Sequence, residues 1–363
     1  MLNKQLFAFI LIAQGVISVL YFTAYKSLEL FFPHLAWGNP VLFGAAMLWS
    51  VGFALFTITS FERDWLLLRV GYLLSALSMV WGLYFLCLSA VVLVSYQAFN
   101  FNLTYGGWLA VLGSLGATLY GTINARLLKI TRLNISLPNL PEFWRGKTAL
   151  VASDLHLGQV LRKKTAQKIV TAINRQQPDI VFIPGDFFDG PKTDFAALAG
   201  EFKNIKAPLG TFFCSGNHEM LAGYEQAEQV IKDAGVRILE DEKTEIHGLQ
   251  LLGLAFKHED DSSVAARLKQ IDIDPQKPSV LLKHIPSHIR AVAQAGVNLQ
   301  ISGHTHLGQV WPFRHLTKRM FKGFDFGLKP LENLLVYTSS GVGTWGPPVR
   351  FLTKSEMVLI TFN

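Results

Sequence analysis

The segment Ile301–His306 places a histidine on either side of one threonine, directly after an apolar run and Gly303. The chain has only ten histidines, and buried imidazoles are costly unless something binds them. In an extended segment, side chains two positions apart point to the same side, with Cα atoms about 6.5–7 Å apart. His304 and His306 are therefore expected to reach two different metal ions about 3.5–4 Å apart. Gly303 is expected to let the backbone turn sharply out of the strand.

Four further segments carry side chains of the same kind after an apolar run. They are Asp154-Leu155-His156, Gly185-Asp186-Phe187-Phe188-Asp189, Gly216-Asn217-His218-Glu219 and His284-Ile285-Pro286. Taken singly, each has an ordinary explanation, because Asp often caps a helix, Gly-Asn often forms a turn, and a lone His is often a core residue. Their repetition at one kind of location instead predicts a metal site of oxygen and nitrogen ligands without a thiolate. The one-residue spacing of Asp154 and His156 matches that of His304 and His306.

The elements that must position these motifs alternate between strands and helices from about Leu133. The expected strands are Thr148–Ser153, Ile180–Pro184, Thr211–Ser215, Leu249–Leu254, Ser279–Lys283, Asn298–Ser302, Leu335–Ser339 and Glu356–Phe362. The expected helices are Lys163–Gln176, Phe195–Asn204 and Tyr224–Ala234. This alternation predicts an α/β layered domain. Open α/β sheets bind ligands at the carboxyl ends of their strands, and all five motifs follow strand ends.

In this order, D-x-H, G-D-x-x-D, G-N-H-E, H-x-P and G-H-T-H resemble the calcineurin-like metallophosphoesterase superfamily. The segments "GHTHLGQ" and "SSGVGTWGPPVRF" resemble its bacterial membrane-associated branch, and the resemblance covers about Ile130 to the C-terminus. It implies a four-layer α/β/β/α domain that holds two divalent metal ions, either Mn, Fe or Zn. The implied activity is hydrolysis of a phosphoester or pyrophosphate by a metal-bridging hydroxide that attacks phosphorus in line with the leaving group.

The resemblance also implies a role for each motif residue. The first metal would be held by Asp154, His156 and His306. Asp186 would bridge to the second metal, which would be completed by Asn217, His284 and His304. His218 would contact the phosphoryl group and protonate the leaving oxygen, which suits a side chain with a pKa near neutrality. Asp189 would orient a neighbouring metal-binding side chain without binding the metal itself.

The first third of the chain has a different composition. Seven charged side chains lie in residues 1–125, and the other fifty-two lie in residues 126–363. Four apolar windows approach or exceed the roughly 20 residues that cross a bilayer: Leu6–Tyr25, Val41–Ser60, Val70–Tyr96 and Gly107–Ile123. We therefore expect a four-helix transmembrane domain (1–125) before the metallophosphoesterase domain (126–363). A large buried helical core is the alternative, but such helices normally carry a charged face.

The lysines and arginines of the short loops predict the orientation of these spans. Arg63 and Arg69 lie between the second and third windows, and Arg126, Lys129 and Arg132 follow the fourth. The opposite side carries Lys26 alone. The positive-inside rule then places the catalytic domain in the cytoplasm of a bacterium, at its inner (plasma) membrane. The first window could instead be a signal peptide, but no small-x-small cleavage site follows it.

The segment Trp311–Phe326 mixes aromatic residues with the basic residues Arg314, Lys318, Arg319 and Lys322. One reading is a solvated loop with buried aromatics. The other is a lipid-facing lip that admits an amphiphilic phosphorylated substrate, because basic and aromatic residues suit anionic membrane interfaces. The expected function is thus a membrane-anchored phosphohydrolase that acts on a lipid-like or lipid-linked substrate, with the bilayer as its partner.

Two other functions remain open from the sequence. The first is a phosphodiesterase for soluble nucleotides or nucleic acid, which a net charge of +7 permits. That charge is spread along the soluble part and gives no indication of specific nucleic-acid binding. The second is a membrane receptor or transporter whose soluble domain binds metal only structurally. The expected spans contain no charged residue of the kind that usually marks a transport path.

Overall fold

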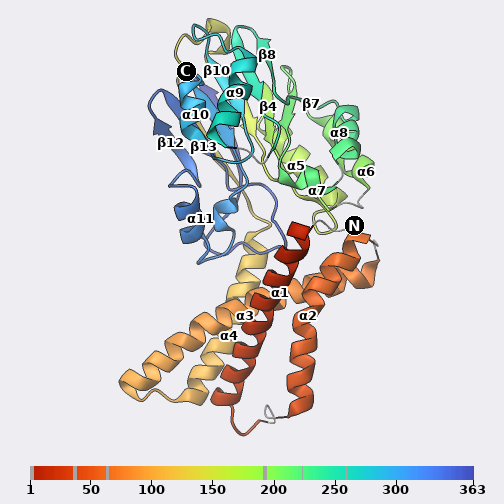
Figure 1. The fold of residues 1–363 in the computed structure, drawn as a ribbon, viewed down its shortest axis with the longest axis vertical. Helices are drawn as coiled ribbons and strands as arrows, with labels where there is room; N and C mark the ends of the chain where they lie inside the picture. The colour runs from red at the N-terminus through yellow and green to blue at the C-terminus, as the bar shows by residue number, and fades with distance from the viewer. Residues whose placement is uncertain (1–3, 36–38, 63–64, 191–193, 223, 258–259) are drawn as a thin grey trace. The chain divides into compact units, whose positions relative to one another are not determined.

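The computed structural model (Figure 1) describes the chain except for residues 1–3, 36–38, 63–64, 191–193, 223 and 258–259. Arg63, which contributed to the predicted orientation, lies outside the described residues. The chain folds into two compact units. One is Met1–Asn124 with Gly346–Phe351, and the other is Ala125–Trp345 with Leu352–Asn363.

The first unit is built from four long helices: α1 (Lys4–Phe31), α2 (Pro40–Glu62), α3 (Leu66–Phe99) and α4 (Leu103–Asn124). Each of the four apolar windows of the sequence lies inside one of them. Within the described part of the chain, α3 alone is long and apolar enough to cross a membrane, and Pro40–Phe56 is a shorter apolar stretch. The four-span membrane domain therefore stays a prediction, while one candidate span is supported.

Close packing of these helices depends on small residues. Phe31, Phe85 and Ala110 belong to one buried cluster that joins α1, α3 and α4. A Cβ added at Gly107 would lie only 2.6 Å from the Cβ of Phe31, so a larger residue there would separate α4 from α1. The chain reverses between α3 and α4 at Asn100, which takes the left-handed conformation (φ 53°) that commonly ends a helix.

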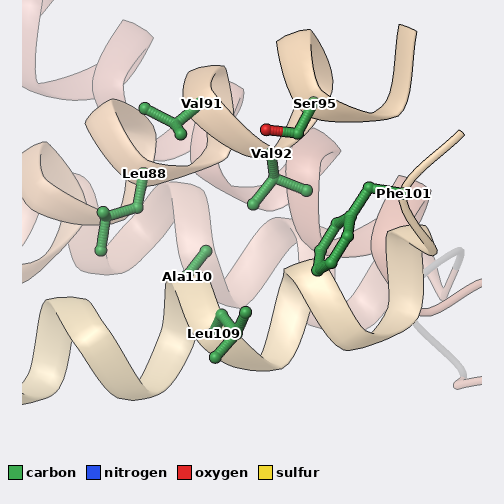
Figure 2. Close-up of a pocket in the computed structure, with 7 residues that line it drawn as sticks. All are labelled: Leu88, Val91, Val92, Ser95, Phe101, Leu109 and Ala110. Atoms are coloured by element: carbon green, nitrogen blue, oxygen red, sulfur yellow. The ribbon is translucent and has the colours of Figure 1, made fainter. Parts of the chain in front are cut away.

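An apolar pocket of about 280 Å³ lies between α3 and α4 (Figure 2). It is lined by Leu88, Val91, Val92, Ser95, Phe101, Leu109 and Ala110. None of these side chains is ionisable, so the pocket offers no acid, base or metal ligand.

The segment Gly346–Phe351 packs with the helices, although it lies far from them in sequence. The backbone N–H of Arg350 donates to the carbonyl of Gly121 at 2.9 Å, and Asn124 Nδ2 donates to the carbonyl of Arg350 at 2.8 Å. The ring of Phe351 lies 4.8 Å from that of Tyr84 and 5.8 Å from that of Tyr120. Nothing in the sequence indicated that this segment leaves the α/β part of the chain.

The second unit contains two six-stranded sheets. The first has the order β1 (Leu128–Ile135), β14 (Ser355–Phe362), β2 (Thr148–Val151), β4 (Ile180–Pro184), β6 (Thr211–Cys214) and β7 (Arg237–Ile238). The second has the order β12 (Gly327–Leu331), β13 (Leu334–Thr338), β11 (Leu299–Ser302), β10 (Ser279–Leu282), β9 (Leu249–Gly253) and β8 (Glu242–Ile246). The short strands β3 (Leu157–Gly158) and β5 (Phe188–Asp189) form a separate parallel pair.

Alternating side chains hold the two sheets face to face. In β4, Ile180 and Phe182 join a core that also contains Val280 and Leu282 of β10, while Val181 and Ile183 point to the opposite face. Successive residues of a strand point to opposite faces, so one apolar run fills two cores. This is why the buried strands read as continuous apolar runs in the sequence.

Helices cover the two outer faces of this sandwich (Figure 1). The first sheet is covered by α5 (Lys163–Arg175), α6 (Phe195–Ala199) and α8 (Tyr224–Asp233), with the 3₁₀ turn η3 (Gly200–Asn204) after α6. The second is covered by α9 (Asp261–Ile271) and α10 (Ile289–Gln294). The remaining helical pieces are η2 (Glu142–Trp144), α7 (Asn217–Ala222), η4 (His306–Gly308) and α11 (Arg314–Met320). The expected α/β domain is confirmed, and its packing has four layers; the expected helix Phe195–Asn204 is α6 followed by η3.

Candidate metal centre

The predicted ligands come from turns at the ends of five buried strands. β2, β4 and β6 run parallel in the first sheet, and β10 and β11 run parallel in the second. Because parallel strands end at the same edge of a sheet, their following turns gather there. Within the second sheet, the N–H of Gly303 donates to the carbonyl of His284. Between the two sheets, His284 Nδ1 lies 2.9 Å from the carbonyl of Pro184.

The first group consists of Asp154, His156 and His306, whose potential ligand atoms lie within 4.8 Å of one another. The Nε2 atoms of the two histidines are 3.0 Å apart, and Nε2 of His306 is 3.5 Å from Oδ1 of Asp154. All three side chains are buried. These residues are the three that the resemblance assigned to the first metal.

The second group consists of Asp186, His284 and His304, within the same 4.8 Å limit. Nε2 of His284 lies 3.1 Å from Oδ2 of Asp186 and 3.1 Å from Oδ1 of Asn217. Asn217, at the start of α7, therefore adds an amide oxygen to this group. The four residues are those that the resemblance assigned to the second metal.

Asp186 belongs to the second group and also lies near the first. Its Oδ2 lies 3.1 Å from Nε2 of His284 and 3.7 Å from Nε2 of His156. Its Oδ1 accepts the backbone N–H of His218 at 2.9 Å, which fixes the plane of the carboxylate. One oxygen thus faces the ligands of both groups, which is the arrangement that a bridging carboxylate needs.

The donor set fits a pair of divalent cations. Each group offers carboxylate and imidazole atoms without sulfur, which suits Zn, Mn or Fe better than the soft metals that bind thiolates. The buried Nε2 atoms of His156 and His306 face each other and a carboxylate oxygen, so their lone pairs converge on one point. A shared cation satisfies these lone pairs, whereas two facing neutral imidazoles can make at most one hydrogen bond.

Electrostatics favour the ligand form of His156, His304 and Asp186. His284 differs, because burial opposes its charged form but Asp186 raises its pKa to about 9. Burial, together with the neighbouring His218, lowers the pKa of His156 to about 4, and burial with His284 lowers that of His304 to about 3. Both imidazoles are therefore neutral near pH 7 and have a free lone pair. Burial opposes ionisation of Asp186, but His284 and His218 hold the pKa of its carboxyl well below its usual range.

The backbone at the ligands is strained. Asp154 (φ 54°), His156 (46°), Asp186 (53°), His304 (71°) and His306 (48°) all take positive φ values. Such conformations cost of order 1 kcal/mol or more for residues other than glycine, and they gather at functional sites. The strain aims side chains of neighbouring residues at one point, which an extended strand cannot do.

The strained backbone also changes what the residue spacing means. The segments Asp154–His156 and His304–His306 are not extended, so the expectation that their side chains follow the alternation of a strand was wrong. His304 and His306 still belong to different groups, whereas Asp154 and His156 belong to the same one. The equal spacing of the two pairs therefore did not predict an equal arrangement.

The expected role of Gly303 also needs correction. Its φ is not among the positive values, and the sharp turn is made by His304. A Cβ on Gly303 would lie 1.9 Å from Oγ of Ser153 and 2.1 Å from Oδ2 of Asp154. Glycine is required there because the two metal-site turns approach each other so closely.

His218 and Asp189 form a pair beside the first group. Nδ1 of His218 lies 3.1 Å from Oδ1 of Asp189, and the ring of His218 meets that of His156 edge to face at 4.6 Å. Burial opposes the charged form of His218, but Asp186 and Asp189 raise its pKa to about 9. The carboxylate thus orients the proposed acid, His218, and favours its protonated form.

Glu219 is a residue whose role the sequence did not reveal. Its Oε2 accepts the N–H groups of Gly216 (2.7 Å) and Asp186 (3.1 Å), and its Oε1 accepts those of Phe187 (2.7 Å) and Phe188 (3.3 Å). This carboxylate holds the turn after β4, and so it positions Asp186. Its place directly after Asn217-His218 was the only signal of this role in the sequence.

Comparisons with known proteins agree with this site. Residues 147–308, which include all seven predicted ligands and His218, match the family model described as calcineurin-like phosphoesterase. An uncharacterized metallophosphoesterase of Aquifex aeolicus is 32% identical over 70% of this chain and 98% of its own length. One from Campylobacter jejuni is 31% identical over 68% of this chain, and the match spans 66% of that protein, just under two thirds.

A protein of Danio rerio named as a transmembrane protein with metallophosphoesterase domain is 26% identical over 70% of this chain and 62% of its own length. A solved dimetal phosphatase from Danio rerio, 12% identical with a TM-score of 0.35, covers 60% of this chain and 100% of its own. The matches to the family model and to the Aquifex protein are sufficient: the chain belongs to the calcineurin-like phosphoesterase family, and it is a metal-binding hydrolase of phosphoesters.

Proposed function

We propose that the protein is a membrane-anchored phosphohydrolase with two divalent metal ions, acting on a lipid-like or lipid-linked phosphoester or pyrophosphate. The observation that carries this proposal is the surface of α11 and its flanks. Trp311, Phe313, Leu316 and Met320 are 36%, 44%, 53% and 62% exposed. Phe321, Phe324 and Phe326 are partly buried, so the segment combines aromatics that pack inward with apolar side chains that face solvent, and the exposed ones support the lipid-facing alternative.

Basic side chains alternate in sequence with these apolar ones, and the segment contacts the candidate metal centre. Arg314, Lys318, Arg319 and Lys322 are all exposed. Phe321, directly after α11, meets the ring of His304 edge to face at 5.9 Å. A surface with exposed apolar groups among cations suits the boundary between anionic headgroups and acyl chains. We call the segment Trp311–Lys322 the lip.

Membrane anchoring has separate support. α3 has the length and apolarity of a membrane span, and the Danio rerio relative is named a transmembrane protein. We propose that α1–α4 form the membrane domain and that the catalytic domain is cytoplasmic, at a bacterial inner membrane. An impermeant thiol reagent should then fail to label a cysteine placed at the exposed Ser262 in intact cells. Labelling without permeabilisation would show that the catalytic domain faces the outside of the membrane.

In the proposed reaction, each group of side chains has a separate task. Asp154, His156 and His306 would hold one metal ion, and Asn217, His284 and His304 the other, with Asp186 between them. When bound, such ions activate water and neutralise the charge that grows on the phosphoryl oxygens. His218 holds a proton on its ring for the leaving oxygen. Asp189 keeps the ring in place through Nδ1.

Removing the charge of the lip should lower the rate of hydrolysis of a membrane-bound substrate but not that of a soluble one. Changing Arg314, Lys318, Arg319 and Lys322 together to Gln should lower hydrolysis of a lipid pyrophosphate in anionic phosphatidylglycerol vesicles by roughly tenfold or more. Each cation near such a surface contributes about 1 kcal/mol. Hydrolysis of soluble bis-p-nitrophenyl phosphate should change little. Initial rates on both substrates provide the measurement.

A matched variant controls for net charge. Lys164, Lys168, Lys203 and Lys269 are exposed elsewhere in the same unit, and changing all four to Gln removes the same charge. This variant should keep both activities. If it loses the vesicle activity equally, or if the lip variant loses both activities equally, the lip does not recognise lipid. Wild-type turnover of soluble nucleotides without any on vesicles would instead favour the soluble-substrate alternative.

A further inference from the structure

A cavity opens beside the second ligand group, and the roles described so far leave most of it unused. Its volume is about 420 Å³, within the roughly 300–1,000 Å³ range of small-molecule sites. Asn217, His284 and His304 form its wall on the side of the metal centre. Leu254 and Phe256 add an apolar part to the lining. A substrate held at the second group can therefore extend into this cavity.

Two lysines make the lining positive. Lys257 and Lys283 both line the cavity, and no carboxylate occurs among the described side chains that do. Lys257 pairs with Asp241 at 2.7 Å, but Asp241 also accepts Nε of Arg267 at 2.9 Å. The single carboxylate of Asp241 thus faces two cations, so Asp241, Lys257 and Arg267 together keep a net positive charge. The Lys257 side chain is 56% exposed and can turn toward a ligand.

Lys283 builds the wall next to the metal ligand His284. Its Nζ donates to the carbonyl of Ile285 and to Oγ of Ser287, both at 3.0 Å, and both of these residues also line the cavity. Lys283 is only 6% exposed. Its charge therefore acts through a medium of lower dielectric than water, where attraction to an anion is stronger.

We propose that this cavity is a subsite for a second anionic group of the substrate, and that Lys257 is its specificity-determining residue. The inference rests on the proposed phosphohydrolase function and narrows its substrate class. One phosphoryl group would lie at the metal ligands, and a neighbouring phosphate or carboxylate would lie against Lys257 and Lys283. Hydrogen bonds between an ammonium group and such an anion are charge-assisted and stronger than neutral ones.

Three small phosphonates test this subsite without any turnover. Methylphosphonate has one anionic group, phosphonoacetate adds a carboxylate, and methylenediphosphonate adds a second phosphoryl group. Isothermal titration of the metal-loaded full chain, with divalent cation in excess of ligand, gives each Kd. The wild type should bind at least one of the two larger anions roughly tenfold or more tightly than methylphosphonate. Which of the two is preferred identifies the second group as phosphate or carboxylate.

Lys257→Met should reduce this preference by about tenfold, and Lys257→Glu should reduce it further by repulsion. The matched control is Lys277→Met, because Lys277 is a comparably exposed lysine (41%) that pairs with Glu245 at 2.8 Å outside the cavity. It should keep the wild-type preference. Thermal unfolding of all variants verifies that each is folded.

The experiment distinguishes failure of the subsite from failure of the proposed function. Wild-type protein that binds methylphosphonate without preferring either larger anion overturns the subsite alone. The subsite is equally overturned if Lys257→Met keeps the preference, or if Lys277→Met loses as much. Binding of none of the three would contradict a phosphoryl site at the metal centre and remove the basis of the inference with it.

Discussion

Changing Asp186 to Asn is expected to remove at least one metal ion per chain and to lower phosphodiester hydrolysis by roughly 10³-fold or more. The physical reason is the position of Oδ2, which faces His284 at 3.1 Å and His156 at 3.7 Å. An amide lacks the negative charge to bridge two cations, and bound metal contributes several kcal/mol to such reactions. Metal content by mass spectrometry and turnover of bis-p-nitrophenyl phosphate measure the two effects.

The substitution should leave the fold intact, because an asparagine oxygen can still accept the N–H of His218 that Asp186 accepts at 2.9 Å. Asp194→Asn is the matched control. Asp194 caps α6 by accepting the N–H of Ala197, and Asn caps helices equally well. This control should keep its metal and its activity. Two metal ions per chain with normal turnover in Asp186→Asn would rule out a bridging role.

Changing His218 to Ala is expected to slow turnover by roughly 10²–10⁴-fold while metal content stays near that of the wild type. His218 contacts Asp189 through Nδ1 and stands beside the first group without being one of the seven predicted ligands. If it protonates the leaving oxygen, the loss should shrink for p-nitrophenyl esters, whose leaving group needs no proton. Rates on a series of aryl and alkyl phosphodiesters give this dependence.

The control for this change is His247→Ala, because His247 is exposed and stacks on Phe143 in another part of the same unit. It should have wild-type activity on every ester. An equal loss on aryl and alkyl esters in His218→Ala would show that His218 binds the phosphoryl group or supports the site, and that it is not the acid.

The strand ends were the part of the fold that the sequence could predict. Apolar runs such as Ile180–Pro184 are long enough for a strand, and five of the eight expected strands are followed by a polar motif whose chemistry is unusual for a turn. Ligand identity then follows from residue type, because oxygen and nitrogen donors after several strands point to one metal site. The amphipathic pattern of Lys163–Arg175 likewise predicted α5, whose buried Ile169 and Ile173 lie one turn apart.

Local backbone geometry could not be predicted in the same way. Residue spacing predicts side-chain direction only for a regular strand or helix, and Asp154, His156, His304 and His306 all take positive φ values. Tertiary contacts impose these conformations, and no pattern of residue types records them. For the same reason, the sequence could not show that a side chain at position 303 would clash with Ser153, which is why glycine is required there.

Long-range contacts set the other limit. The strand β1 pairs in parallel with β14, more than two hundred residues later in the chain, and Gly346–Phe351 packs with the helices of the first unit. Lys257 and Lys283 line one cavity although they come from different strand ends. Apolar periodicity reports which face of an element is buried but does not report against what. Tertiary packing decides which elements contact each other, and this packing could not be predicted from the sequence alone.

The most direct test of a binuclear centre is anomalous diffraction from crystals of the active, metal-loaded protein, recorded at the absorption edge of the bound metal. Two peaks about 3.5–4 Å apart are expected. One should lie among Asp154, His156 and His306, and the other among Asn217, His284 and His304, with Asp186 between them. A single peak in protein that hydrolyses phosphodiesters at the full rate would contradict the binuclear centre.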